Sequence, residues 1–265
     1  MAEGQKTVRI AGIVLKWIRE ARALNMRRIE PLIREAAAKG AEIVVTTESF
    51  LDGYAITDKA LDAETYHALG EPIPGGEYYE QLAALARELN IHLAAGIHEL
   101  DGDIHYNTAV LIGPDGELIG KYHKQRLGHE TNYNTPGSES RVFDTPFGRV
   151  GMMICKDRGG EELVRGFFDN GADFVLCLSG GMFGPEKNDP VLQARSRENQ
   201  AYVVFVHPCE FLVTAPDGSN CENVLLGDPL ERGAASVISE EEADGDRDSN
   251  GVFCFDLPLN QPSRK

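Results

Sequence analysis

The sequence predicts a single α/β domain, and three observations support this fold class. Apolar, β-branched runs alternate with amphipathic helical segments along nearly the whole chain, as in proteins whose sheets and helices pack in layers. The chain has 265 residues, enough to bury a large core, and no linker rich in Ser or Pro divides it. Hydrophobic residues make up 42% and charged residues 26%, a balance that excludes wholesale disorder. We therefore predict one domain over residues 1–265 with two or more interior layers.

The first half of the chain alternates clearly between strands and helices. In the predicted helix at 20–39, apolar residues recur at helical spacing and Gly40 follows as a stop signal. Pro114-Asp115-Gly116 is typical of the turn in a hairpin. The pattern predicts strands at 8–15, 42–46, 91–97, 107–112 and 117–122, and helices at 20–39 and 77–90.

The second half repeats this alternation, apart from an acidic segment at 239–251. Alternating Asp residues in that segment resemble the start of a calcium loop, but Ser249 and Phe255 stand where such a loop needs Gly and Glu. We therefore predict a solvated acidic loop there, and a turn at Gly227-Asp228-Pro229. The pattern predicts strands at 149–155, 173–178, 201–206 and 252–255, and helices at 161–170 and 190–200.

Charge and cysteine content limit the classes of partner. The 42 acidic side chains exceed the 26 basic ones, a net charge of −16, which disfavours nucleic acid or an anionic membrane as the main partner. No apolar run approaches the roughly 18 residues of a membrane span, and the first residues lack the apolar core of a secretory signal. The five cysteines form no C-x-x-C pair, which argues against a disulfide scaffold and a zinc site. We expect a cytoplasmic protein.

Cys155 is the first candidate for chemistry. It ends an apolar strand and precedes a helix that opens after Gly159-Gly160, so the positive end of that helix would stabilise a thiolate. Lys156 and Arg158 would act in the same direction. The competing interpretation is a buried packing residue, which is the commoner role of a cysteine in such a strand and the role that we assign to the other four.

A thiolate nucleophile needs a base or a cation nearby. Histidine is the usual base, so a Cys–His hydrolase stays open. No spacing singles out one of the candidates among His92, His98, His123, His129 and His207. Glu48 follows the predicted strand at 42–46, and α/β proteins place reacting groups at the carboxyl ends of such strands. A carboxylate there could transfer protons, although a loop carboxylate in water is the ordinary alternative.

Three segments, taken together, resemble a known family. TTESFLDGY at 46–54, GKYHKQRL at 120–127 and GRVGMMICKD at 148–157 occur in the order of the three motifs of the carbon–nitrogen hydrolase family, the nitrilase superfamily. The resemblance extends from residue 8 to about residue 257. It implies a four-layer α-β-β-α sandwich, consistent with the alternation above.

The resemblance also implies a catalytic triad of Glu48, Lys124 and Cys155. The thiolate would attack the carbonyl carbon of an amide-like substrate, and Lys124 with the backbone N–H of Lys156 would stabilise the oxyanion. Glu48 would move the protons and activate the water that hydrolyses the thioester. The family's second glutamate falls on Glu130, which would keep Lys124 charged and orient the substrate.

The chain departs from the family at positions that line the pocket in relatives. Lys156 replaces an aromatic residue or Asn, and His207 replaces Asn. Where the family often has Ser-Asn after the next strand, this chain has Ser179-Gly180-Gly181. The predicted substrate-binding or supporting residues are Tyr54, Glu130, Lys156, Gly180 and His207. Lys156 or His207 is predicted to favour an acyl group that carries a carboxylate.

The resemblance predicts hydrolysis of a non-peptide C–N bond in a small amide or N-carbamoyl amine, without a metal or other cofactor. Nitrile hydrolysis at the same site is one alternative, and a catalytically idle binding subunit is another. The complete triad argues against an idle site, because a buried lysine and carboxylate are costly to keep together. Relatives dimerise, which implies a homodimer or larger homo-oligomer. Arg195 and Glu198, in a segment that resembles the family's Arg-x-x-Glu-Asn helix, are expected to form a structural ion pair.

Overall fold

Two six-stranded sheets form the centre of the protein, in a computed structural model that describes residues 6–181, 183–226, 237–245 and 250–259. The first sheet has the order β12-β1-β2-β3-β4-β5, in which β1, β2 and β3 are parallel and the other neighbours are antiparallel. Its strands are β1 (Thr7–Val14), β2 (Ile43–Val45), β3 (His92–Asp101), β4 (Ile104–Ile112), β5 (Leu118–His123) and β12 (Gly251–Pro258).

The second sheet has the order β11-β10-β9-β8-β7-β6, with β7, β8 and β9 parallel. Its strands are β6 (Val142–Thr145), β7 (Gly148–Ile154), β8 (Phe174–Leu178), β9 (Tyr202–His207), β10 (Glu210–Thr214) and β11 (Asn220–Leu225). Each sheet therefore contains three parallel strands, whose carboxyl ends are where α/β proteins place reacting groups.

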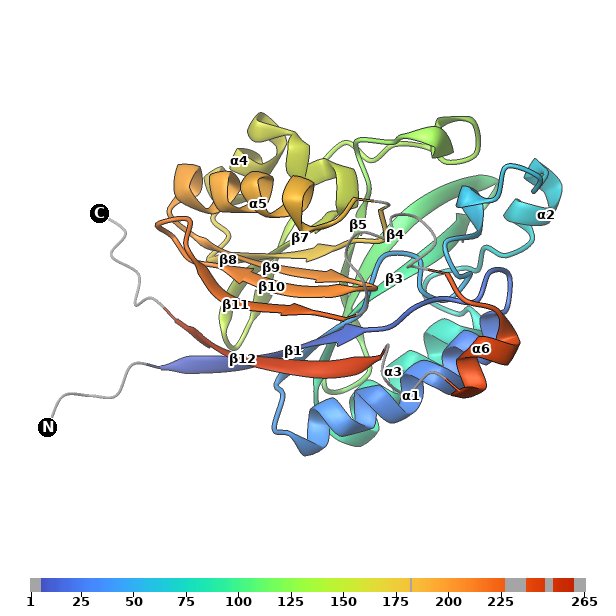
Figure 1. The fold of residues 1–265 in the computed structure, drawn as a ribbon, viewed down its shortest axis with the longest axis horizontal. Helices are drawn as coiled ribbons and strands as arrows, with labels where there is room; N and C mark the ends of the chain where they lie inside the picture. Colours follow the sequence, from blue (N-terminus) through green and yellow to red (C-terminus); the bar gives the residue numbers. More distant parts are fainter. Residues whose placement is uncertain (1–5, 182, 227–236, 246–249, 260–265) are drawn as a thin grey trace, which may run out of the picture.

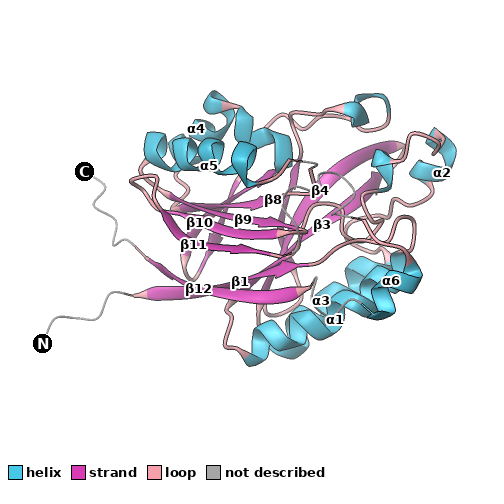
Figure 2. Cartoon of the chain, viewed as in Figure 1, coloured by secondary structure: helices cyan, strands magenta, loops and turns pink. Residues whose placement is uncertain are grey.

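Helices cover the outer faces of both sheets (Figures 1 and 2). α1 and α3 lie over the first sheet, and α4 and α5 lie over the second. The α-helices are α1 (Arg22–Ala38), α2 (Ala63–His67), α3 (Glu77–Leu89), α4 (Glu161–Asp169), α5 (Pro185–Asn199) and α6 (Glu240–Gly245), and the 3-10 helices are η1 (Ala55–Thr57), η2 (His129–Asn132) and η3 (Cys155–Gly159). The predicted four-layer α-β-β-α sandwich is confirmed. Within the described ranges, none of the helices has the length and apolar character needed to cross a membrane.

The core follows from the two-residue period of the strands. In β1, Ile10 belongs to the cluster between the two sheets, whereas Ala11 and Ile13 belong to the cluster under α1 and α3. Gly12 faces the second sheet, where a β-carbon on it would lie 2.2 Å from the ring of Phe211. Only glycine fits there, so the two sheets approach each other closely at β1 and β10.

Most predicted elements are present, with shifted ends. α5 begins at Pro185, not at Pro190, and tolerates Pro190 one turn later. The prediction omits β6, which is too short to show a period, the buried strand β10, and the exposed edge strand β11, whose residues are mostly polar. It also omits the short helix α2. The turn predicted at Gly227-Asp228-Pro229 lies outside the described residues.

The predicted acidic loop at 239–251 is wrong in its first part, because residues 240–245 form α6. Ser239 Oγ accepts the backbone N–H of Glu242, and a Glu242 carboxylate oxygen accepts the N–H of Ser239. This reciprocal capping box satisfies two backbone donors, and the negative charges of the first turn favour the helix N-terminus.

Candidate active site

Glu48 lies in the loop that follows β2, and its side chain is fully buried. The loop packs directly on β3, where a β-carbon on Gly96 would lie 2.5 Å from the carbonyl oxygen of Thr47. Trp17 Nε1 donates a 2.9 Å hydrogen bond to Thr47 Oγ1 and holds the loop from the other side. These two contacts fix the position of the loop backbone that carries Glu48.

Lys124 and two glutamates form a buried cluster. Lys124 Nζ donates a 2.7 Å hydrogen bond to Glu48 Oε1 and forms an ion pair with Glu130 Oε1. Asn107, on β4, joins the two carboxylates, because its Nδ2 donates to Glu48 Oε1 at 2.8 Å and to Glu130 Oε2 at 3.0 Å. The backbone N–H of Lys124 also donates to the carbonyl oxygen of Asn107, at 2.9 Å. Asn107 thus orders both carboxylates and the backbone of Lys124.

The charges of this cluster stabilise one another. Burial by itself lowers the pKa of Lys124, but the nearby negative charges of Glu48 and Glu130 outweigh it and raise that pKa well above its ordinary value. Burial raises the pKa of Glu130, and the Lys124 ammonium more than reverses this effect, so that the pKa of Glu130 is lowered overall. The site therefore holds a buried ammonium ion between two carboxylates.

Cys155 begins η3 directly after β7. Its φ of 46° lies in the left-handed region, which is uncommon for a residue other than glycine and costs energy. The side chain is 6% exposed. Arg158 Nη1 donates to the Cys155 sulfur at 3.5 Å, and Arg158 Nη2 donates to Asn188 Oδ1 at 2.5 Å. A buried guanidinium thus lies against the sulfur, and it can stabilise a thiolate.

Two consecutive glycines after β8 connect Glu48 with Cys155. A β-carbon on Gly180 would lie 2.6 Å from Trp17 Cη2 and 3.1 Å from Glu48 Oε2, and a β-carbon on Gly181 would lie 2.9 Å from the Cys155 sulfur. The carboxylate and the sulfur therefore approach adjacent residues of one segment. Glu48 Oε2 is buried and accepts no hydrogen bond from the described residues, whereas Oε1 is held by Lys124 and Asn107.

Of the predicted supporting residues, Lys156 lies at the surface and Tyr54 lies in the interior. Lys156 is exposed and its Nζ donates to the carbonyl oxygen of Leu127 at 2.9 Å, so its ammonium is engaged on the neighbouring loop. Tyr54 is buried, with its ring centroid 5.4 Å from that of Trp17 and 6.0 Å from that of His129.

His207, at the end of β9, holds the glycine segment in place. Its Nδ1 accepts the N–H of Cys209 at 3.2 Å, so its Nε2 carries the proton and donates to the carbonyl oxygen of Gly181 at 2.6 Å. Burial lowers the pKa of His207 to about 4, and the ring is therefore neutral near pH 7. Among the described residues, the donor to the Cys155 sulfur is Arg158 and not a histidine.

Sequence reasoning did not assign a role in the site to Asn107 or Trp17, and it weighed Arg158 only as a neighbouring charge. Asn107 lies in the segment YNTAV at 106–110, which also resembles the family in the stretch before its lysine, and this resemblance is a signal that could have found it. Arg195 and Glu198 form the expected ion pair within α5, at 2.9 Å.

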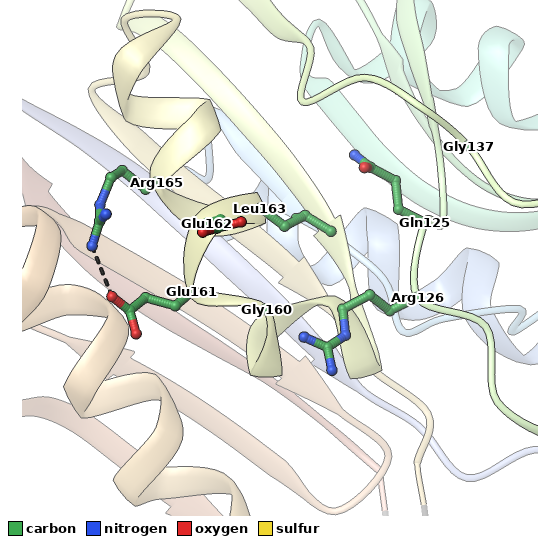
Figure 3. Close-up of a pocket in the computed structure, with 8 residues that line it drawn as sticks. All are labelled: Gln125, Arg126, Gly137, Gly160, Glu161, Glu162, Leu163 and Arg165. Carbon is green, nitrogen blue, oxygen red and sulfur yellow. Dashed lines mark hydrogen bonds and ion pairs between the residues drawn. The ribbon is translucent and has the colours of Figure 1, made fainter.

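A surface groove of about 710 Å³ lies at the start of α4 (Figure 3). Its lining includes Gln125 and Arg126, which follow Lys124, and the start of α4, where Glu161 pairs with Arg165. The triad residues do not line this groove. Within the described ranges, no cluster of three or more His, Cys, Asp or Glu side chains is arranged to hold a metal ion.

Several known proteins are similar to this chain. A family model described as carbon–nitrogen hydrolase matches residues 9–228. A nitrilase of Pyrococcus abyssi is 37% identical over 182 residues, which cover 68% of this chain and 67% of the relative. The human omega-amidase NIT2 is 34% identical over 199 residues, which cover 69% of this chain and 68% of the relative.

Solved structures show the same fold. Nit3 of Saccharomyces cerevisiae, described as a member of branch 10 of the nitrilase superfamily, superposes with a TM-score of 0.77 at 22% identity, over 96% of this chain and 90% of that one. A mutant amidase from Nesterenkonia sp. AN1, with the acetamide moiety of fluoroacetamide added covalently at its active-site cysteine, gives a TM-score of 0.75 at 19% identity, over 97% and 93%. The chain belongs to the carbon–nitrogen hydrolase family, and it is an enzyme that acts on carbon–nitrogen bonds other than peptide bonds.

Proposed function

We propose that the protein hydrolyses the C–N bond of a small-molecule amide through a thioester on Cys155, with Glu48 as the proton carrier and Lys124 as the oxyanion stabiliser. The observation that carries this proposal is that the two oxygens of the Glu48 carboxylate have different surroundings. Lys124 and Asn107 hold Oε1, while Oε2 has no partner among the described residues and approaches the glycine segment that touches the Cys155 sulfur. One oxygen is anchored and the other is free to exchange a proton.

In the first half-reaction, Glu48 Oε2 accepts the thiol proton and the sulfur of Cys155 bonds to the carbonyl carbon. The carbonyl π electrons move to oxygen, where the Lys124 ammonium and the backbone N–H of Lys156 stabilise the negative charge. The C–N bond then breaks as Glu48 returns the proton to nitrogen. The amine or ammonia leaves, and a thioester remains on Cys155.

In the second half-reaction, a water molecule takes the place of the amine. Glu48 accepts a proton from this water as its oxygen bonds to the thioester carbon, and the same two donors stabilise the oxyanion. The C–S bond breaks, sulfur recovers its proton from Glu48, and the carboxylic acid leaves. The cycle uses one water and restores every protein group.

We assign an amide substrate because several relatives carry the name omega-amidase, while the relative named nitrilase keeps nitriles as the alternative to test. Matched amide, N-carbamoyl and nitrile compounds, supplied to one preparation with ammonia as the readout, test this. The expected order places the amide first, and the Lys124→Met variant should release no ammonia from any of the three. Faster turnover of the nitrile would contradict the amide assignment.

We propose further that the acyl group carries a carboxylate, on the strength of Arg158. The cations expected at Lys156 and His207 do not serve here, because Lys156 is bound to Leu127 and His207 is neutral. Arg158 is only 7% exposed and forms none of the ion pairs observed among the described residues. Arg158 contacts the Cys155 sulfur, so an anionic group on the acyl chain bound to that sulfur could pair with its guanidinium.

Acylation changes the charge around Arg158. A thiolate can balance the guanidinium, but a thioester sulfur is neutral, so acylation removes the negative charge that contacts the buried cation. The nearby carboxyl of Glu210 stays protonated at neutral pH, because burial and the charge of Asp189 raise its pKa to about 9. A carboxylate on the acyl group would restore the balance in the thioester state.

The Arg158→Met variant tests this preference. We expect it to reduce the ratio of kcat/KM for an acidic amide to that for a neutral amide of equal length by about tenfold to a hundredfold, the worth of a charged hydrogen bond. Lys156→Ala is the matched control and should leave the ratio unchanged. An unchanged ratio in Arg158→Met, or a wild-type preference for the neutral amide, would overturn the assignment.

A further inference from the structure

Asp157 lies two residues after Cys155, and its carboxylate is completely buried. Oδ1 accepts the backbone N–H groups of Gln125, at 3.2 Å, and of Arg126, at 2.7 Å. Oδ2 accepts the hydroxyl of Tyr122 at 2.8 Å and the backbone N–H of Ile154 at 3.1 Å. Four donors therefore converge on one side chain.

The residues that supply these four donors are sequence neighbours of two proposed catalytic residues, Lys124 and Cys155. Tyr122 and Gln125 flank Lys124 in the sequence, and Ile154 directly precedes Cys155. The two groups come from different sheets, since Tyr122 lies on β5 of the first sheet and Ile154 ends β7 of the second. One carboxylate thus fastens the lysine segment to the cysteine turn across the gap between the sheets.

Among the described residues, one other hydrogen bond joins the two segments, from Lys156 Nζ to the carbonyl oxygen of Leu127 at 2.9 Å, and it is made by an exposed side chain. The backbone of Lys124 is tied to β4 through the carbonyl oxygen of Asn107 and to the following loop through the N–H of Gly137, both at 2.9 Å. These bonds fix Lys124 within its own half of the molecule. The hydrogen bonds of Asp157 fix it relative to Cys155.

We infer that Asp157 is a positioning residue that sets the separation between the Lys124 ammonium and the Cys155 sulfur, an inference that rests on the proposed function. The oxyanion forms on a carbon bonded to that sulfur, and the ammonium must already be in place when the charge develops. An error of about 1 Å in such a geometry can cost about a hundredfold in rate. Asp157 touches no reacting atom, and it acts through the two segments that it joins.

The test measures the rate of thioester formation and steady-state kinetics in a graded series of variants. Asp157→Asn keeps one acceptor oxygen, and we expect its acylation rate and kcat to fall about tenfold to a hundredfold with KM changed less than threefold. Tyr122→Phe removes one of the four donors and should give a smaller loss in the same two rates. If Asp157→Asn fails to fold, Tyr122→Phe decides the question, because it keeps the other three hydrogen bonds.

Glu71→Gln is the matched control for stability alone. Glu71 is also a buried carboxylate, and it accepts the backbone N–H groups of Tyr78 and Tyr79 at 3.2 and 2.7 Å, away from the triad. This variant should lower the melting temperature and keep the wild-type acylation rate. The inference is overturned if Asp157→Asn or Tyr122→Phe acylates at the wild-type rate, or if Glu71→Gln loses acylation equally. A wild-type enzyme that forms no thioester would instead refute the proposed function.

Discussion

Lys124 Nζ lies 2.7 Å from Glu48 Oε1, and neither side chain is more than 2% exposed. The two residues are 76 positions apart in the sequence, and they come from the ends of two strands of the first sheet. An ion pair this deeply buried loses the solvation of both charges, so it is retained only where partners compensate each charge. Glu130 and Asn107 provide that compensation.

Replacing Glu48 with Gln removes the proton carrier and keeps its size. We expect kcat to fall by about 10²–10⁴-fold, the usual contribution of a general base, when ammonia release is measured. The control is Glu99→Gln, because Glu99 is also buried and paired with a lysine, Lys121, outside the triad. Activity of Glu48→Gln comparable to that of Glu99→Gln would contradict the role of Glu48.

Replacing Lys124 with Met leaves two buried carboxylates facing each other without their cation. Breaking a buried pair in this way destabilises proteins by about 3–5 kcal/mol. We therefore expect a loss of that order in the free energy of unfolding in urea at pH 7, in addition to the loss of activity. A variant as stable as the wild type would show that the cluster does not depend on the ammonium.

Adding a methyl group at Gly181 should disturb the nucleophile directly. The new β-carbon would lie 2.9 Å from the Cys155 sulfur, closer than such contacts allow. We expect Gly181→Ala to lower kcat at least tenfold, by the same argument of misplacement as above. Gly159→Ala is the control, since nothing lies within 4 Å of its β-carbon. Equal activity of the two variants would argue against a close contact between Gly181 and Cys155.

Because His207 is buried in its neutral form, we expect the protein to lose stability at acid pH. The pKa of His207 is about 4 in the folded protein against an ordinary value of 6.5, because burial disfavours the charged ring. Between these values the unfolded chain binds a proton that the folded protein does not, so stability is complete above about pH 6.5 and falls as the pH is lowered towards 4. His207→Gln lacks this dependence.

Urea unfolding at pH 7 and pH 4.5 measures the effect. The stability advantage of the wild type over His207→Gln should shrink by about 2 kcal/mol between the two pH values. An advantage of equal size at both pH values would mean that His207 is not held neutral by burial.

The pKa of Glu210 leads us to expect the opposite dependence, between about pH 4.5 and pH 9. Burial, followed by the charge of Asp189, raises its pKa from 4.5 to about 9. The folded protein then holds a proton that the unfolded chain has lost, so this contribution to stability is present below about pH 4.5 and is lost as the pH rises towards 9. Glu210→Gln should therefore gain in melting temperature relative to the wild type between pH 5 and pH 8.5. A difference that stays constant would rule out a protonated Glu210.

The fold was largely predictable because its information is local. The alternation in β1 separates Ile10 from Ala11 and Ile13, and the structure places them in two different clusters. The capping box of Ser239 and Glu242 was also present in the sequence, and it explains the helix that replaced the expected loop.

The contacts of the candidate site depend on tertiary structure. The position of Asn107 between two carboxylates arises from the pairing of β4 with β3 and β5, which residue spacing does not reveal. Likewise, Arg158 reaches the Cys155 sulfur, while its neighbour Lys156 turns to Leu127, because the chain enters η3 through a left-handed residue. The sequence pattern therefore identifies the candidate charged residues, but the tertiary structure determines which of them are in contact.

The most direct measurement is the mass of the enzyme caught during turnover. Acid quenching within the first turnovers on an amide, followed by intact-protein and peptide mass spectrometry, should show one acyl group added to the protein and located on Cys155. The adduct should be absent from Cys155→Ala. Steady turnover with no adduct on Cys155, or turnover by Cys155→Ala, would contradict the account.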